Sequence, residues 1–315
     1  MQLKRTVSNQ HIENSTMRIF ITGSTGFIGS HVAADLIASG HQVIGLTRSE
    51  SGRQALTAIG AQAYRGDIED LHSLQHAAGE CDGVIHTAFD HNFANFVENC
   101  QKDRRAILAL GAALEGSDRP PIITSSTAMG SAVPGQKALE HCFNPDHPNP
   151  RVASELAGLE LYQRGVNVSV MRLSQIHDTR KQGLVTEVIE LARKTGISAY
   201  IEGALNSWCA THIDDTAQLY RLALERQESG SRYHATAEES VSFRSIAEMI
   251  AHKWRLPLVA VQAENAAAHF GWLNPFVSKD MSASSTRTRE VLQWNPQGPT
   301  LLTDVENMRD DSLAN

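Results

Sequence analysis

A glycine-rich segment near the N-terminus carries the most specific chemical signal in the chain. Residues 22–29 read Thr-Gly-Ser-Thr-Gly-Phe-Ile-Gly and lie between a short apolar run and a stretch with helical spacing. The three glycines permit a tight turn, a close approach to a pyrophosphate and close packing of helix on strand. Free N–H groups at the start of the helix attract a diphosphate. The segment therefore predicts a dinucleotide site, and a tight turn without a ligand is the alternative. The predicted contacts are Gly23, Thr25, Gly26, Phe27, Ile28 and Gly29.

The end of the predicted second strand, residues 42–47, indicates which dinucleotide binds. Enzymes that use NAD usually place Asp or Glu there to hold the ribose 2′-hydroxyl. This chain has Thr47, Arg48 and Ser49 instead. A guanidinium between two hydroxyls suits a 2′-phosphate, so we predict NADP(H) as the cofactor. The alternative is that Arg48 is a solvated surface side chain.

Polar side chains that could act on a carbonyl group follow later strand ends. Ser125 and Ser126 stand at the end of the fifth predicted strand, where a hydroxyl either donates to a substrate oxygen or caps the strand. His177 follows the sixth strand and titrates near neutrality. Arg151 offers positive charge to an oxyanion but is a poor proton donor, and its simpler role is an i,i+4 pair with Glu155.

The remaining polar candidates have simpler interpretations. Asp90 and His91 follow the fourth strand, where they face the same cleft and are read as loop hydrogen-bonding groups. His86 is read as a buried strand residue. The segment 141–147 contains two histidines and a cysteine, but prolines make it an irregular loop, so no metal site is predicted.

The chain as a whole alternates strands with helices. Apolar runs predict strands at 17–22, 42–47, 62–65, 83–88, 122–125 and 166–173. Helical spacing predicts helices at 27–39, 51–59, 70–78, 93–114 and 153–164. This alternation predicts an α/β fold with a doubly wound parallel sheet of the Rossmann type, whose ligands lie at the carboxyl ends of the strands.

The regular alternation of predicted strands and helices ends after residue 173. Helices are expected at 184–194, 215–226, 245–254 and 264–270, between loops rich in Trp, Pro and Gly. The predicted organisation is therefore a disordered extension at 1–16, an NADP-binding domain at 17–173 and a substrate-binding lobe at 174–315 that is partly interleaved with the sheet. Convergence of aromatic side chains on the cleft would suit an apolar carbonyl compound. These aromatics are Phe89, Phe93, Phe143, Trp208, Phe270, Trp272 and Phe276.

The composition of the chain limits the classes of partner that it is expected to bind. The 315 residues carry a net charge of −7, which leaves no basic excess for a nucleic acid. No apolar run approaches the roughly 18 residues of a membrane span. The four cysteines are widely separated, which favours a reducing, cytoplasmic location. We expect a small-molecule substrate, no nucleic acid and no membrane, and a homodimer is one possible assembly.

Several segments together resemble the short-chain dehydrogenase/reductase superfamily, and within it the extended and atypical NAD(P)-dependent epimerase/dehydratase-like branch. These segments are 22–29, 66–67, 84–88, 124–127, 172–174 and 212–217, and the resemblance covers residues 17 to about 294. It implies that Asp67 and Ile68 lie at the adenine, that Thr87 and Ala88 follow the ribose, and that Ser174 borders the nicotinamide carboxamide.

The chain departs from the family pattern at the proton donor. The family uses a tyrosine four residues before a lysine, and those two positions hold Arg151 and Glu155 here. Asp103 stands near the usual helix asparagine. We therefore expect an NADP(H)-dependent oxidoreductase that acts on a small, fairly apolar carbonyl or alcohol through a non-standard proton donor. The alternatives are an epimerase or isomerase with transient hydride transfer, and a non-catalytic NADP(H)-binding regulator.

Overall fold

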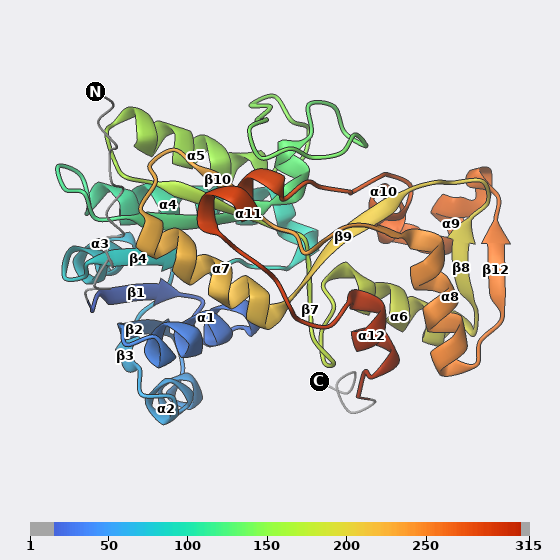
Figure 1. Cartoon of the computed structure of the whole chain (residues 1–315), viewed down its shortest axis with the longest axis horizontal. Helices are drawn as coiled ribbons and strands as arrows, with labels where there is room; N and C mark the ends of the chain where they lie inside the picture. Colours follow the sequence, from blue (N-terminus) through green and yellow to red (C-terminus); the bar gives the residue numbers. More distant parts are fainter. Residues whose placement is uncertain (1–15, 310–315) are drawn as a thin grey trace, which may run out of the picture.

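A seven-stranded, all-parallel sheet forms the larger part of the molecule (Figure 1). The structure is a computed structural model that describes residues 16–309. The strand order is β10-β6-β5-β4-β1-β2-β3, which confirms the predicted doubly wound fold. The strands are β1 (Arg18–Thr22), β2 (Gln42–Thr47), β3 (Gln62–Arg65), β4 (Gly83–His86), β5 (Pro121–Ser126), β6 (Ser169–Leu173) and β10 (Arg232–Ala235).

Helices cover both faces of this sheet, which is why its central strands are almost continuously apolar. They are α1 (Phe27–Ala38), α2 (Glu50–Ala58), α3 (Leu71–Gly79), α4 (Phe96–Ala112), α5 (Val152–Gln163) and α7 (Ile213–Arg226). On one face, Leu36 of α1 and Leu219 of α7 belong to the same buried cluster. On the other, Leu74, Ile107 and Leu161 join α3, α4 and α5 in a second cluster.

The C-terminal lobe has its own core beside the carboxyl ends of the large sheet (Figure 1). Its strands β11-β9-β7 form one small sheet, and β12 pairs with β8 in another. Trp208 and Phe243 meet in its core, with ring centroids 5.0 Å apart. Its elements are β7 (Gln175–His177), α6 (Leu184–Thr195), β8 (Ser198–Ile201), β9 (Ser207–His212), β11 (Glu238–Ser242), α8 (Phe243–Trp254), β12 (Leu258–Val261), α9 (Ala266–Phe270), α10 (Asn274–Val277) and α12 (Leu301–Glu306). Helix α11 (Thr286–Leu292) packs instead on α7 and β10 of the large sheet.

The structure differs from the predicted elements mainly after residue 173. Strand β10 returns from this half of the chain to complete the large sheet beside β6, and α7 covers it next to α1 (Figure 1). The predicted helix 93–114 begins with a 3-10 turn at Phe93–Asn95 and ends at Ala112. Apart from Thr16, the predicted N-terminal extension lies outside the described residues. All four cysteines are free, and no helix within residues 16–309 has the length and apolar character of a membrane span.

Candidate active site

The glycine segment forms a close-packed turn between β1 and α1. Gly23 has φ +69°, and a Cβ there would lie 2.6 Å from the backbone nitrogen of Ala88. A Cβ on Gly29 would collide with the Gly23 carbonyl oxygen and would lie 2.7 Å from Thr87 Oγ1. Only glycine fits both positions, because neighbouring backbone occupies the space of a side chain. The turn is therefore built for close approach of backbone to backbone and to a ligand.

The start of α1 is open toward a ligand. Its N-cap, Gly26, provides no side-chain cap, and the first turn of the helix contains no acidic residue. Thr25 and Gly26 are exposed, while Phe27 and Ile28 are the first two residues of the helix. Open amides at the positive end of a helix dipole bind a diphosphate. The cradle of glycines and free amides thus fits a dinucleotide.

The end of β4 closes the other side of this cradle. Thr87 donates from Oγ1 to the carbonyl oxygen of Thr22 at 2.8 Å, and Ala88 donates its N–H to Thr22 Oγ1 at 3.4 Å. Thr87 and Ala88 therefore lie beside Gly23, where the resemblance placed the ribose. Ser174 is farther along the strand ends, and its hydroxyl donates to the Ala235 carbonyl oxygen.

The ends of β2 and β3 shape the place predicted for the adenosine. Ser49 caps α2 by accepting from the Gly52 N–H at 3.0 Å. A Cβ on Gly52 would collide with Thr47 Oγ1 and would lie 3.2 Å from Thr25 Cγ2, so the start of α2 packs directly against the glycine turn. Gly52 is a residue that sequence reasoning missed. The nearest signal was its place at the second position of the predicted helix 51–59.

The Arg48 side chain is exposed and only weakly held, so it can move to contact a phosphate group. Its side chain is 80 % exposed, and its one ion pair within the described residues joins Nη1 to Asp67 Oδ2 at 3.7 Å. Such an exposed pair holds a guanidinium weakly. Asp67 also accepts the N–H of Glu69 at 2.9 Å, and Ile68 packs against the core under α3 and α4.

Arg151, in place of the family tyrosine, lies nearly buried immediately before α5. Its Nη2 donates to the Thr124 carbonyl oxygen at 3.0 Å, and its Nη1 lies 3.1 Å from Asp103 Oδ2. Its guanidinium also covers the ring of Phe89, 3.8 Å from the centroid. The predicted pair with Glu155 is wrong, because the buried carboxylate of Asp103 on α4 takes that place.

Asp103 is the centre of a buried polar network. It accepts from His86 Nε2 at 3.0 Å and from Ser154 Oγ at 2.6 Å. His86 Nδ1 in turn accepts from Thr22 Oγ1 at 2.7 Å, so His86 is buried with both ring nitrogens bonded, as expected. Burial alone would raise the pKa of Asp103, but the Arg151 charge and these hydrogen bonds hold it below the usual value. The network therefore fixes Arg151 as a charged group.

Glu155, in place of the family lysine, faces a different neighbour. Both of its carboxylate oxygens accept from Arg172 of β6 at 2.7 Å, and Arg232 of β10 lies 3.1 Å away. Arg172 also donates to the carbonyl oxygen of Cys142 at 2.9 Å and to His234 Nε2 at 3.2 Å. This fully buried group ties the loop before α5 to the sheet. Glu155 therefore does not fill the role that the lysine has in the family.

The serine pair lies at the end of β5, as predicted. The Ser125 hydroxyl is buried and has no hydrogen-bond partner within the described residues. Ser126 accepts the Ala128 N–H at 3.3 Å and is half-buried. The Arg151 guanidinium bonds the carbonyl of the peptide that joins Thr124 to Ser125. An unsatisfied hydroxyl and a guanidinium paired with Asp103 therefore lie close together at this strand end.

The two histidines predicted for the cleft differ in their surroundings. His177 is fully buried, and its Nδ1 donates to Asp304 of α12 at 2.7 Å. Its other neighbours are Glu238 and His212 of the C-terminal lobe, so the structure does not bring it to Ser125. His91 packs edge-on against Phe89, with centroids 5.1 Å apart. Desolvation and the Arg151 charge lower the pKa of His91.

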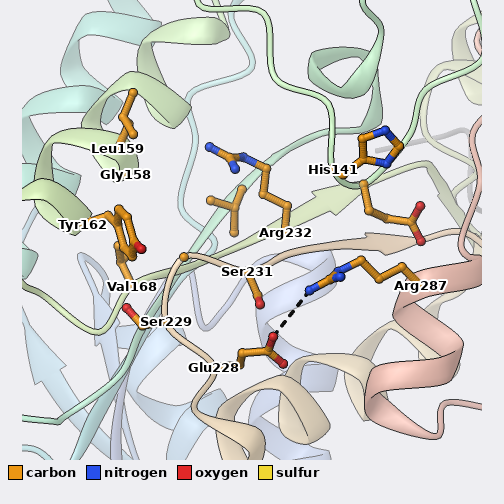
Figure 2. A pocket seen from close by; sticks show the side chains of 13 residues that line it. His141, Gly158, Leu159, Tyr162, Val168, Glu228, Ser229, Ser231, Arg232 and Arg287 are labelled. Carbon is orange, nitrogen blue, oxygen red and sulfur yellow. Dashed lines mark hydrogen bonds and ion pairs between the residues drawn. The ribbon is translucent and has the colours of Figure 1, made fainter.

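The larger of two described cavities lies away from all these residues. It measures about 460 Å³ and lies between α5 and the edge strand β10. Figure 2 shows Arg232 and Tyr162 along it and the ion pair of Arg287 with Glu228, whose atoms are 3.5 Å apart. Phe143 lies under Arg232. The cavity contains none of the predicted cofactor contacts, so it is separate from the dinucleotide site.

Several of the aromatic side chains considered for the cleft lie elsewhere in the structure. Trp208 and Phe270 are buried in the core of the C-terminal lobe, and Phe276 packs against that core. Trp272 is about half exposed, and the side chain of Phe93 lies outside the described residues. Phe89 contacts Arg151, a candidate catalytic residue. Within residues 16–309, no group of three or more His, Cys, Asp or Glu side chains is arranged so that it could hold a metal ion.

A second cavity, of about 370 Å³, borders the glycine turn itself. Thr25, Gly26 and Phe27 line one side, and Arg180 and Lys181 of the C-terminal lobe line the other. Sequence reasoning missed both cations, because a basic pair after a short strand is indistinguishable from ordinary surface charge.

Comparison with known proteins agrees with this geometry. The sequence profile of the NAD dependent epimerase/dehydratase family matches residues 19–236. The chain is 42 % identical to "Uncharacterized protein C2A9.02" of Schizosaccharomyces pombe, over 92 % of this chain and 98 % of the relative. It is 25 % identical to 4-hydroxy-2-methyl-3-oxo-4-farnesyl-3,4-dihydroquinoline-1-oxide ketoreductase of Stigmatella aurantiaca, over 81 % and 80 %. Among solved structures, Thermus thermophilus UDP-glucose 4-epimerase in complex with NAD gives a TM-score of 0.70 at 20 % identity, over 95 % and 99 %.

Proposed function

Since the chain belongs to the NAD-dependent epimerase/dehydratase family, we propose that it is an NADP(H)-dependent oxidoreductase that reduces a small, fairly apolar ketone or aldehyde, or oxidises the matching alcohol. The observation that carries the proposal is the buried Ser125 hydroxyl, which has no hydrogen-bond partner within the described residues and lies at the strand end next to the cradle, beside the Arg151 guanidinium. Unsatisfied buried donors are costly unless a ligand uses them.

The choice of NADP(H) rests on the end of β2. Thr47 stands where a carboxylate would reject a 2′-phosphate, and the exposed Arg48 and the start of α2 are beside it. A phosphate there would gain a charge-assisted contact and the N-terminus of a helix. The bound cofactor would supply or accept the hydride.

The chain's own residues would stabilise the charge that develops on the substrate oxygen. Hydroxyl protons of Ser125 and Ser126 and the guanidinium of Arg151 would donate hydrogen bonds to this oxygen. Arg151 stays charged at any working pH, so it stabilises an alkoxide without giving up its own proton. His91, whose pKa is lowered, is then the nearby group that exchanges the proton with the solvent.

The proposed apolar substrate has two supports. Phe89 borders Arg151, and the ketoreductase relative is named for a farnesylated quinoline oxide. The alternative of a non-catalytic binding protein is favoured by Glu155, which is engaged with Arg172 in the position of the missing lysine. An epimerase remains the second catalytic alternative.

A screen of apolar ketones and aldehydes with NADPH tests the proposal. We expect the absorbance of the reduced nicotinamide to fall with at least one substrate. The Ser125→Ala/Ser126→Ala variant should lower kcat about 100-fold, with the Kd for NADPH unchanged. Tight NADPH binding without turnover of any substrate would favour a binding protein. Epimerisation without net cofactor oxidation would favour the second alternative.

A further inference from the structure

The cavity beside the glycine turn contains more positive charge than the chain itself neutralises. We propose that Arg180 and Lys181 clamp the cofactor diphosphate from the side opposite the glycine turn. The proposal rests on the proposed function, because it concerns the same dinucleotide. It adds a second, cationic wall to a site that otherwise consists of backbone amides.

The segment 178–182, called here the clamp turn, is built to hold these two side chains in place. One carboxylate oxygen of Asp178 accepts the N–H groups of Arg180 and Lys181 at 2.6 and 2.8 Å, and the Asp178 N–H returns to the Lys181 carbonyl at 2.8 Å. The fully buried Gln182 donates to the Asp178 carbonyl at 2.8 Å. The backbone of the clamp turn is therefore fixed while Arg180 and Lys181 stay exposed.

The C-terminal lobe anchors the clamp turn from behind. The Arg309 N–H donates to the Thr179 carbonyl at 3.0 Å. His177, the residue just before the turn, donates to Asp304 of α12. The backbone that carries the two cations is thus preformed, which limits the backbone entropy lost when they bind an anion.

The electrostatics of the cavity require an anion. Gly26 begins α1, whose positive end faces the cavity, and the first turn of this helix has no acid. Within the described residues, neither Arg180 nor Lys181 takes part in an ion pair. Asp178 is the one carboxylate in the lining, and it already accepts two N–H groups. Two cations facing a helix N-terminus repel it unless negative charge lies between them.

A diphosphate meets this requirement in position and in charge. The cavity shares Thr25, Gly26 and Phe27 with the predicted phosphate cradle, so a diphosphate on the amides of α1 lies between the helix and the clamp turn. Its two negative charges match the two cations. A substrate phosphate would have to share the same amides, which makes the cofactor the better match.

Calorimetric titration of the full chain tests the clamp with two probes. NADPH contains the diphosphate, and adenosine 2′-monophosphate contains the 2′-phosphate without it. In Arg180→Ala/Lys181→Ala we expect the Kd for NADPH to rise about 10- to 100-fold, with the Kd for adenosine 2′-monophosphate unchanged. The control Arg193→Ala/Lys194→Ala removes the same charge from the exposed last turn of α6 and should leave both values as in the wild type.

Each other outcome contradicts a definite part of the account. If the wild type binds NADPH and the double variant binds it equally well, the clamp is wrong and the proposed function stands. A parallel loss of affinity for both probes also overturns the clamp, because the two cations would then act through the fold or through general charge. If the wild type binds neither probe, the proposed function fails, and the clamp fails with it. Circular dichroism of each variant verifies that the fold is intact.

Discussion

At the scale of single residues, two substitutions define this site. The family's tyrosine and lysine are replaced by Arg151 and Glu155, and each is neutralised by a different buried partner. Arg151 faces Asp103, whereas Glu155 faces Arg172. A buried charge requires such a partner, so a tyrosine could not replace Arg151 here without leaving the Asp103 carboxylate uncompensated. Each substituted residue is therefore part of a buried network of charged side chains.

The Arg151 charge should be measurable at His91. Arg151→Met/Asp103→Asn removes the cation together with its carboxylate, which avoids an uncompensated buried charge. Arg151 lowers the pKa of His91, so its removal favours the imidazolium and should raise this pKa toward 6.5. NMR titration of the histidine ring protons measures it, with His91→Gln to assign the signal. An unchanged pKa would show that Arg151 does not act on His91, and the double variant leaves the net charge of the chain as it is because it removes one positive and one negative charge.

At the scale of elements, the sequence predicted the βαβ framework and, after residue 173, the helices α6, α7, α8 and α9, but none of the strands there. The strands from 18 to 126 are short apolar runs bounded by glycine, proline or polar residues, and their pattern is unambiguous. Strand β10 contains Arg232 and His234, whose partners Glu155 and Ser284 lie far away in the sequence. Such burial of polar groups is decided by tertiary contacts, which no local pattern contains.

The same difference between local patterns and tertiary contacts explains which parts of the site could be predicted from the sequence. The glycine turn was predictable because its spacing and its place between strand and helix are local. The partner of Arg151 was not, because Asp103 lies 48 positions earlier on another helix. The clamp turn shows the same limit, since only the fold brings residues 178–182 to the start of α1.

The contact between the glycine turn and α1 should tolerate no side chain. In Gly29→Ala, the new methyl group would collide with the Gly23 carbonyl, so α1 must move away from the turn. We expect a loss of about 1–3 kcal/mol in the free energy of unfolding and a large loss of NADPH affinity. Gly79→Ala is the matched control, because a Cβ at this helical glycine meets nothing within 4 Å. Urea unfolding and NADPH titration measure both effects, and equal behaviour of the two variants would contradict the geometry.

At the scale of the whole molecule, polar contacts join the sheet to the C-terminal lobe. His234 of β10 donates from Nδ1 to the Ser284 carbonyl at 2.7 Å and accepts from Arg172. Burial, with the Arg172 charge, lowers the pKa of His234 to about 3. A proton on this ring would remove the acceptor that Arg172 uses, so the neutral form belongs to the folded state.

Stability should consequently fall in mild acid. The pKa of His234 is about 3 in the folded chain, against 6.5 for a histidine exposed to water, so the unfolded chain binds the proton first. Stability is complete above pH 6.5 and decreases by about 1.4 kcal/mol per pH unit below it. Between pH 6.5 and 5, urea unfolding should show about 2 kcal/mol more loss for the wild type than for His234→Gln. Equal slopes for the two proteins would contradict this role.

The central claim is that the turn between β1 and α1 binds a pyridine dinucleotide and that the end of β2 selects its 2′-phosphate. Calorimetric titration of the wild type and of Arg48→Ala with NADPH and with NADH tests it most directly. We predict that the wild type binds NADPH at least about tenfold more tightly than NADH. Arg48→Ala should remove most of this difference and leave the affinity for NADH unchanged. Tighter binding of NADH by the wild type, or no binding of either nucleotide, would contradict the account.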